Sequence, residues 1–263
     1  MASYSQDFGW ASLLIEAAEN VRNIVRRTLL NKPALALIEI KELLDRKAQA
    51  AVEETLRQSG MPARIISEEG ECVIGEGGPY VVVDPVDGTT NLARGIPLAV
   101  TSLAVSETPR LAGVFTGIVL DLYSGELFRA ERNRGAWRGG VRIHPSRSRP
   151  IDEALISIDI SKGAPIEPVK ELISRAKHLR ELGCSALSLC YMASGVMDAH
   201  VDLRGSLRAT DVAAGLLILK EAGGIYSING VVGGDLELNR ESTLTLVAAS
   251  SPWMLDEINR LTI

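Results

Sequence analysis

The chain has 263 residues, of which 46% are hydrophobic and 23% charged, which is enough for a substantial core in one large domain or two lobes. Its formal net charge is −5 and it has no long basic run, which argues against a sequence-independent nucleic-acid surface. The longest apolar stretches contain charges or glycines, so we expect none of them to span a membrane.

Two long helices are predicted near the start of the chain. Apolar residues recur at helical spacing from Trp10 to Leu30, and Lys32-Pro33 is expected to end this helix. A second amphipathic helix is expected from Ile38 to Ser59. Met1 to Trp10 has no basic flank followed by an apolar core, so no signal peptide is expected.

The run from Val81 to Asn91 carries the strongest functional signal in the sequence. Tyr80 to Val83 is short, apolar and β-branched, which predicts a buried strand. Asp84 follows at the end of that strand, where a buried carboxylate needs a metal or hydrogen-bond donors. Asp87 comes next, and Gly88 to Asn91 forms a small polar turn typical of a helix start. Carboxylates are ligands for Mg²⁺, and the N–H groups at the start of a helix bind phosphate. We therefore expect a Mg²⁺ ion and a phosphate group to bind side by side here.

Each residue of this turn has an expected task. The carbonyl of Val86 can face a cation that the two aspartates share, and Gly88, without a Cβ, can bring its N–H close to a phosphate oxygen. Thr89 or Thr90 can cap the helix and orient a water molecule. The alternative is an ordinary Asx-turn and N-cap in which both aspartates only form the turn.

Beyond this run the sequence predicts strands mixed with helices. The predicted strands are Leu98–Ser106, Leu111–Leu120, Glu126–Ala130, Ala136–Ile143 with a hairpin turn at Gly139-Gly140, Ala154–Asp159, Val196–Leu203, Gly224–Asn229 and Leu244–Ala249. The predicted helices are Pro168–His178, Ser185–Ser194, Val212–Ala222 and Pro252–Leu261. Since there is no regular βαβ alternation, an α+β fold of layered sheets and helices is favoured.

A polar, basic, Pro-flanked stretch from His144 to Pro150 is the expected linker. It divides the chain into an N-terminal α+β lobe, residues 1–145, with the two aspartates, and a C-terminal α/β lobe, residues 146–263. The second lobe is expected to complete the substrate site, so that the two form one compact catalytic unit.

Three sequence blocks resemble the inositol monophosphatase family of Mg²⁺-dependent, Li⁺-sensitive phosphomonoesterases. Asp84-Pro85-Val86-Asp87-Gly88-Thr89-Thr90-Asn91 resembles the family's D-P-x-D-G-T-T-N signature. Ile65 to Gly70 is similar to its apolar-x-x-E-E block, and Thr210 to Gly215 resembles W-D-x-A-A-G with Thr210 in place of Trp. The stretch from Asp202 to Asp211 looks more like the archaeal branch, which often hydrolyses both inositol phosphate and fructose 1,6-bisphosphate.

The resemblance implies a layered α-β-α-β-α sandwich and a catalytic site with two Mg²⁺ ions. A further acidic residue would support a third ion. The implied metal ligands are Glu68, Asp84, the carbonyl of Val86, Asp87 and Asp211. Hydrolysis is expected to be direct, through a metal-activated water and without a covalent phosphoenzyme.

Three residues have implied catalytic tasks with open alternatives. Glu68 and Thr89 would polarise the attacking water, although Glu68 also fits a solvated acidic loop. Asp45 aligns with the acid that supports a third metal, but the family's T-x-x-D approach is missing before it. A helix-surface acid paired with a neighbouring Arg or Lys is the alternative for Asp45. For Asp211 the alternative is an acid that merely complements a helix dipole.

The resemblance also implies a set of substrate contacts. They are Gly88, Thr89, Thr90, Arg180, Gly183, Cys184, Ser185, Asp202, Arg204 and Asp211. Cys184 replaces the hydroxyl residue of the family's G-[ST]-A-A loop, and Asp202 falls where the family uses an acid to hold a polyol hydroxyl. Arg204 could clamp a distal phosphate bidentately or be a surface arginine, and Arg180 could face the substrate or solvent.

The expected substrate is a small phosphorylated polyol or sugar, with inositol 1-phosphate and fructose 1,6-bisphosphate first. NADP, 3′-phosphoadenosine 5′-phosphate and histidinol phosphate remain alternative substrates because relatives with the same core use them. A non-catalytic regulatory role is a further alternative. The family implies a homodimer. Cys72, Cys184 and Cys190 are odd in number and unevenly spaced, which predicts reduced cysteines and a cytoplasmic protein.

Overall fold

A computed structural model describes residues 4–31 and 36–262. Lys32-Pro33, expected to end the first helix, lies outside these residues. The helices are α1 Tyr4–Leu30, α2 Leu37–Ser59, α3 Thr89–Arg94, α4 Lys170–Arg175, α5 Ser185–Ala193, α6 Ala209–Ala222 and α7 Pro252–Leu261, with 3₁₀ turns at Leu111–Gly113 and Glu167–Val169. Across the described ranges, no helix has the length and apolar composition that crossing a membrane requires.

The strands form two mixed sheets. The first has the order β2-β1-β3-β4-β5-β6-β7-β8 and the second the order β10-β9-β11-β14-β12-β13. In chain order they are β1 Ala63–Ser67, β2 Gly70–Ile74, β3 Tyr80–Asp87, β4 Val100–Ser106, β5 Val114–Asp121, β6 Leu127–Glu131, β7 Gly135–Arg138, β8 Val141–Arg142, β9 Leu155–Asp159, β10 His178–Arg180, β11 Ala199–Arg208, β12 Ile225–Ile228, β13 Val231–Val232 and β14 Thr243–Ala249.

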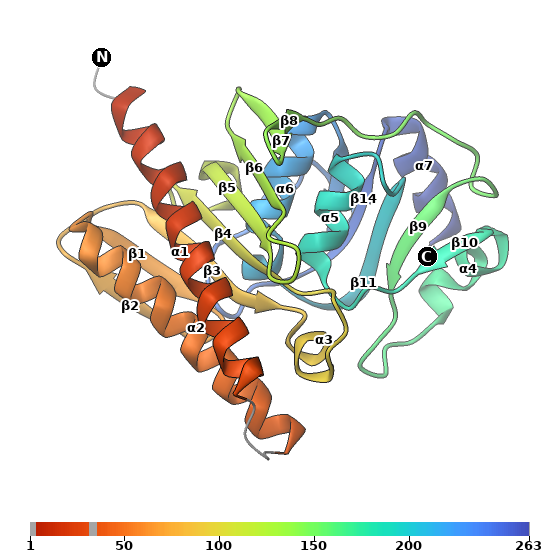
Figure 1. Ribbon diagram of the computed structural model, residues 1–263. Helices are drawn as coiled ribbons and strands as arrows, with labels where there is room; N and C mark the ends of the chain where they lie inside the picture. The colour runs from red at the N-terminus through yellow and green to blue at the C-terminus, as the bar shows by residue number, and fades with distance from the viewer. Residues whose placement is uncertain (1–3, 32–35, 263) are drawn as a thin grey trace.

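The elements stack in five layers (Figure 1). Helices α1 and α2 cover one face of the first sheet, and α5 and α6 fill the space between the sheets. Helices α4 and α7 cover the outer face of the second sheet. The predicted α-β-α-β-α sandwich is therefore confirmed.

Strand β3 is buried on both faces, which explains its continuous apolar run. Val81 and Val83 pack into the cluster under α1 and α2, whereas Val82 packs into the central cluster with α5 and α6. This alternation follows from the two-residue period of a strand. The strand thus runs between two apolar layers and ends where α5 and α6 begin.

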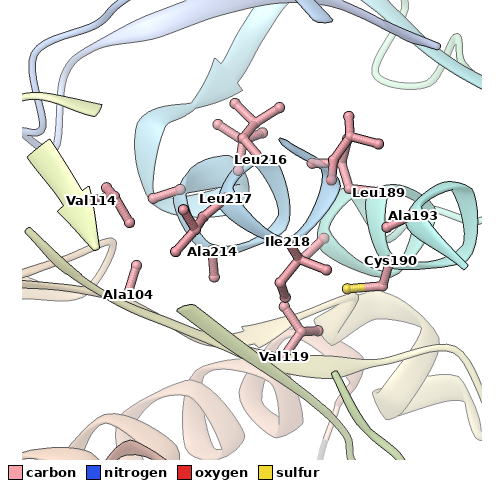
Figure 2. Packing of buried hydrophobic residues seen from close by; sticks show 14 of the residues in the cluster. Ala104, Val114, Val119, Leu189, Cys190, Ala193, Ala214, Leu216, Leu217 and Ile218 are labelled. Atoms are coloured by element: carbon pink, nitrogen blue, oxygen red, sulfur yellow. The ribbon is translucent and has the colours of Figure 1, made fainter. Parts of the chain in front are cut away.

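The central helices pack very closely against the first sheet and each other (Figure 2). Ile218 of α6 lies between Val119 of β5 and Cys190 of α5. A Cβ added to Gly215 would lie 2.8 Å from Cδ1 of Leu189, so only glycine allows this approach of α6 to α5. This packing fixes the first turns of both helices beside the end of β3.

Two predicted elements of the second half were wrong at their bounds. The helix expected from Pro168 to His178 is a 3₁₀ turn followed by α4, and His178 begins strand β10, because residues 178–180 pair with the free edge of β9. The strand expected from Val196 to Leu203 is β11, which continues to Arg208 through a register shift between Asp202 and Leu207.

Helix α1 begins at Tyr4, six residues before the predicted start at Trp10. The remaining predicted elements agree within a few residues, and α7 agrees at both ends. The turn at Gly139-Gly140 joins β7 to β8, as predicted. The acidic loop that was the alternative for Glu68 is the tight turn between β1, which ends at Ser67, and β2, which begins at Gly70. The first sheet ends at Arg142 and the second begins at Leu155, with the stretch from His144 to Pro150 between them; the division into two lobes stays a prediction.

Candidate active site

A bulge at the end of β3 brings two acids to one site. Asp84 pairs with Ser102 of β4, but Asp87 pairs with Val100, so three steps on β3 match two on β4. In a regular strand, residues three apart point to opposite faces, and the extra residue of the bulge corrects this. Both carboxylates therefore act on one another: the negative charge of Asp87 contributes to raising the pKa of Asp84.

Asp84 is enclosed by the turn that follows it. It is 3% exposed, and its Oδ1 accepts a hydrogen bond from the N–H of Val86 at 3.1 Å. The carbonyl of Val86 accepts one from the Thr89 hydroxyl at 2.9 Å. That hydroxyl also lies 3.0 Å from Oδ1 of Asp45 on α2, so Asp45 reaches the site through Thr89.

The start of α5 holds Asp87 from the second half of the chain. The N–H of Ala186 donates to Oδ2 of Asp87 at 2.7 Å, and the thiol of Cys184 donates to the Asp87 backbone carbonyl at 3.4 Å. N–H groups at a helix N-terminus stabilise a carboxylate. Cys184 therefore keeps a polar contact where the resembling family has a hydroxyl residue.

Asp211 and Glu68 complete the acidic cluster. Asp211 lies in the first turn of α6, where its Oδ2 accepts a hydrogen bond from the N–H of Arg208 at 3.0 Å. Glu68 lies in the turn between β1 and β2 and forms an ion pair with the Arg208 guanidinium. Glu68, Asp84 and Asp211 each offer one carboxylate oxygen, and these atoms lie within 4.8 Å of one another.

The acids of this cluster share an unfavourable electrostatic environment. Burial is the main cause that raises the pKa of Asp84 well above its ordinary value. Burial also raises the pKa of Asp87 and of Asp45 to about 7, and that of Asp211 to about 6. Buried carboxylates with like charges beside them favour a bound cation. Since every donor is a carboxylate oxygen, the cluster fits Mg²⁺.

The turn after Asp87 needs glycine for a steric reason. Gly88 has φ 89°, and a Cβ there would lie 2.6 Å from the carbonyl oxygen of Leu98. Gly88 is also the N-cap of α3, so the capping expected of Thr89 or Thr90 was wrong. The hydroxyl of Thr89 instead contacts Val86 and Asp45.

A cavity of about 410 Å³ opens beside Asp87 and Asp211. This volume is within the usual range of small-ligand sites, about 300–1,000 Å³. The predicted residues Thr90, Gly183, Ser185 and Arg204 line it with the two acids. Asn91 connects its walls, because its side-chain amide donates to the carbonyls of Leu98 at 3.0 Å and Leu182 at 2.7 Å.

The lining of this cavity leaves out five predicted contact residues: Gly88, Thr89, Arg180, Cys184 and Asp202. Arg180 is exposed on β10 and donates to the carbonyl of Leu179 at 2.7 Å. Asp202 is fully buried, and both its oxygens accept hydrogen bonds from Arg204, at 3.0 and 2.6 Å. Asp202 is therefore a partner of Arg204 in this structure, not an acid that faces the cavity.

Arg204 lines the cavity, but its guanidinium is engaged within the protein. Besides Asp202, it contacts Asp159 at 2.8 Å and donates to the hydroxyl of Ser161 at 2.7 Å. Its side chain is 8% exposed. The bidentate geometry expected for a distal phosphate is used on Asp202, which corrects the clamp predicted from the sequence.

The structure adds cavity residues that the sequence reading missed: Asn91, Asp159, Ser161, Lys162 and Glu181. Asp159 ends a correctly predicted strand and Ser161 follows it, so polarity at a strand end could have indicated them. Glu181 could not be found, because it follows β10, a strand that was not predicted. For Lys162 no sequence signal distinguishes it from a surface lysine.

Comparisons with known proteins agree with these motifs. The model of the inositol monophosphatase family matches residues 10–257. The chain is 33% identical to a fructose-1,6-bisphosphatase/inositol-1-monophosphatase of Methanothermobacter thermautotrophicus, over 94% of each chain. It is 34% identical to the Nus factor SuhB of Escherichia coli, over 70% of each chain. A solved structure from Pyrococcus horikoshii, described as similar to inositol-1 monophosphatase, superposes with TM-score 0.82 at 27% identity, covering 97% of this chain and 98% of that one.

Proposed function

This chain belongs to the inositol monophosphatase family, and we propose that it is a Mg²⁺-dependent phosphoric monoester hydrolase acting on a small polyol or sugar phosphate. The observation that carries the proposal is the group of Glu68, Asp84 and Asp211, with carboxylate oxygens within 4.8 Å of one another. Asp87 and Asp211 of this cluster line a cavity of about 410 Å³, so a phosphate ester in that cavity would lie beside bound metal.

Glu68, Asp84, Asp87, Asp211 and the carbonyl of Val86 would hold the metal. When bound, Mg²⁺ would supply Lewis-acid polarisation of the phosphate and neutralise charge that develops during hydrolysis. The buried position of Asp84 supports this assignment, since a buried anion without a cation is costly. The number of ions, two or three, stays a prediction.

The proposed proton acceptors are Thr89 and, through it, Asp45. The Thr89 hydroxyl lies between the Val86 carbonyl and Oδ1 of Asp45. An attacking water can give its proton to Oγ of Thr89, which passes its own proton to Asp45. Burial raises the pKa of Asp45 to about 7, and a base with a pKa near the working pH is the most effective one. The raised pKa also favours this role over that of an ordinary surface acid.

Inositol 1-phosphate and fructose 1,6-bisphosphate are the proposed substrates, because the archaeal relative is named for activity on both. Histidinol phosphate, NADP and 3′-phosphoadenosine 5′-phosphate remain alternatives. A regulatory role like the one that the name Nus factor suggests for SuhB is the second candidate. A protein with only a binding role has no need for the four acids Glu68, Asp84, Asp87 and Asp211, all of which this chain keeps.

We also propose that the protein is a homodimer and that it is located in the cytoplasm. The homodimer follows from the resemblance alone. Cytoplasmic location is supported by Cys72, Cys184 and Cys190, which are free thiols.

The test is phosphate release from a panel of esters with Mg²⁺ and with a chelator. The panel holds inositol 1-phosphate, fructose 1,6-bisphosphate, histidinol phosphate, NADP and 3′-phosphoadenosine 5′-phosphate. We expect Mg²⁺-dependent release from the first two. Release from none of them would contradict catalysis and favour the regulatory role, and release from another member alone would contradict the substrates proposed.

A further inference from the structure

Two charged side chains line the cavity away from the acidic cluster. Lys162 follows β9 and Glu181 follows β10, and both are exposed. The two strands pair in parallel, so their carboxyl ends lie at the same edge of the second sheet. In α/β proteins ligands commonly bind beyond the carboxyl ends of parallel strands. A substrate with its ester phosphate at Asp87 and Asp211 would therefore extend toward these two side chains.

Arg204 fastens the loop that carries Lys162. Its guanidinium joins Asp159 at the end of β9 and Ser161 of this loop to Asp202 of β11, and it is nearly buried. A bidentate arginine pair gives a rigid geometry. Because its donors are occupied in this way, Arg204 is suited to positioning the loop and not to holding the substrate.

Lys162 carries a positive charge that is free to contact a ligand, whereas that of Arg204 is engaged within the protein. It has φ 60°, a left-handed conformation that is uncommon for a residue other than glycine, and it lines the cavity. Among residues 4–31 and 36–262, no carboxylate forms an ion pair with it within 4.0 Å. Its ammonium is thus available to an anionic group on a ligand.

Glu181 carries the opposite charge to Lys162 and lies at the same edge of the second sheet. The backbone N–H of Ile160 favours the charged form of its carboxylate, and the neighbouring Asp159 opposes it. Burial, followed by the negative charge of Asp159, raises its pKa. A carboxylate in this place repels a second phosphate and accepts hydrogen bonds from sugar or polyol hydroxyls.

We propose that Lys162 and Glu181 together determine how the site discriminates bisphosphates from monophosphates, with Lys162 attracting a distal phosphate and Glu181 opposing it. This inference rests on the phosphatase activity proposed above. Arg204 is a positioning residue that acts through Lys162. The relative use of the two substrate classes is then a balance of two opposite charges, each of which a single substitution removes.

The test uses fructose 1,6-bisphosphate and fructose 1-phosphate, which differ only in the distal phosphate. The measured quantity is the ratio of kcat/KM for the bisphosphate to that for the monophosphate. Lys162→Met should lower the ratio on the order of tenfold, the value of one charge-assisted hydrogen bond. Glu181→Gln should raise it roughly threefold or more through loss of repulsion. Methionine keeps the unbranched stem, and glutamine keeps an acceptor for Ile160.

Matched controls separate local charge from net charge. Lys177→Met and Glu171→Gln remove the same charges from exposed positions that do not line the cavity, and both should leave the ratio unchanged. Lys162→Arg should restore the wild-type ratio to within a few-fold. Higher salt should weaken the effect of Lys162, since an exposed charge is screened.

Arg204→Lys tests the positioning role, because it keeps a positive charge beside two buried aspartates. It should lower the ratio in the wild-type background and leave it unchanged in the Lys162→Met background. A loss that persists in that background would show that Arg204 contacts the distal phosphate directly and would overturn its assignment.

If either Lys162→Met or Glu181→Gln leaves the ratio within twofold of wild type, the discrimination proposal fails. In that case the wild-type protein still hydrolyses both esters, so the proposed function stands. If the wild-type protein releases phosphate from neither ester, the proposed function fails first. The two failures are therefore distinguishable in one data set.

Discussion

At the scale of single residues, the acids of the site differ in which groups hold their carboxylates in position. Asp87 is held by an N–H of α5 and Asp84 by an N–H of its own turn, whereas Glu68 is paired with Arg208. The first two are positioned by the backbone and do not depend on metal for their place. Glu68 has an internal cation that competes with any metal ion for its carboxylate.

Asp87→Asn should abolish turnover and leave the fold intact. The substitution removes a charge from the acidic cluster but keeps an oxygen that can accept a hydrogen bond from the N–H of Ala186. We expect kcat to fall about a hundredfold or more, without a lower melting temperature of the metal-free protein, because a repulsive charge is lost. Asp152→Asn, at an exposed position, is the control. Normal kcat with normal Mg²⁺ dependence would refute the assignment of Asp87.

Arg208→Gln should increase the affinity for Mg²⁺. The guanidinium of Arg208 pairs with Glu68, and its removal frees that carboxylate and deletes a positive charge beside Asp211 and Asp84. We expect roughly fivefold tighter binding, the order of a partly exposed ion pair. Titration calorimetry measures it, with the exposed Arg175→Gln as control. Unchanged or weaker binding would mean that Arg208 does not compete with the metal.

At the scale of elements, the site depends on the contact of α5 with α6. Both helices begin beside the end of β3, and Gly215 sets how closely they approach. The small side chains of Ala213 and Ala214 before Gly215 also allow this close packing. A displacement of either helix would move Ala186 away from Asp87 or Asp211 away from Asp84.

Gly215→Ala should destabilise the protein by about 1–3 kcal/mol, the usual cost of overpacking a core. The added Cβ would lie 2.8 Å from a Leu189 carbon, so α5 or that side chain must shift. Gly9→Ala is the matched control, because Gly9 is also helical but has no atom within 4 Å of an added Cβ. It should stabilise α1 by about 0.5–1 kcal/mol. Urea unfolding measures both, and equal effects would contradict the packing argument.

Sequence reasoning succeeded where local signals agree and failed where an element depends on a distant partner. Helix α7 was predicted at both ends because Ser251 caps it and Pro252 opens it. Strand β10 was not predicted, and its first residue, His178, was assigned to a helix, because only the edge of β9 makes residues 178–180 extended. The acids of the cluster lie in motifs, whereas Lys162 and Glu181 reach the cavity only through tertiary structure.

At the scale of the whole molecule, the stability of the metal-free protein should depend on pH through the acidic cluster. Burial raises the pKa of Asp87 to about 7 and that of Asp211 to about 6, above the ordinary value of 3.8. At pH values between about 4 and these raised pKa values, the two carboxyl groups bind more protons in the folded state than in the unfolded state. Stability from these groups is therefore fully present below pH about 4 and is lost as pH rises through about 6 to 7.

Denaturation of metal-free protein at pH about 5 and about 7.5 tests this, with Asp87→Asn beside wild type to isolate the cluster. The measured quantity is the free energy of unfolding of wild type minus that of the variant. As the pH rises, this difference should fall by up to about 1.4 kcal/mol per pH unit for each extra proton that the folded state binds. Mg²⁺ should stabilise wild type more at the higher pH, because protons and metal compete for the same oxygens. A relative stability that rises with pH would contradict the raised pKa values.

We propose that the acidic cluster binds Mg²⁺ and that the bound Mg²⁺ promotes hydrolysis of a phosphate ester in the adjoining cavity. The most direct measurement is phosphate release from inositol 1-phosphate as a function of Mg²⁺ concentration, for wild type and for Asp84→Asn. We expect a saturable rise with Mg²⁺ in wild type and loss of that response in the folded variant. Release that is independent of Mg²⁺, or the same Mg²⁺ response in both proteins, would contradict it.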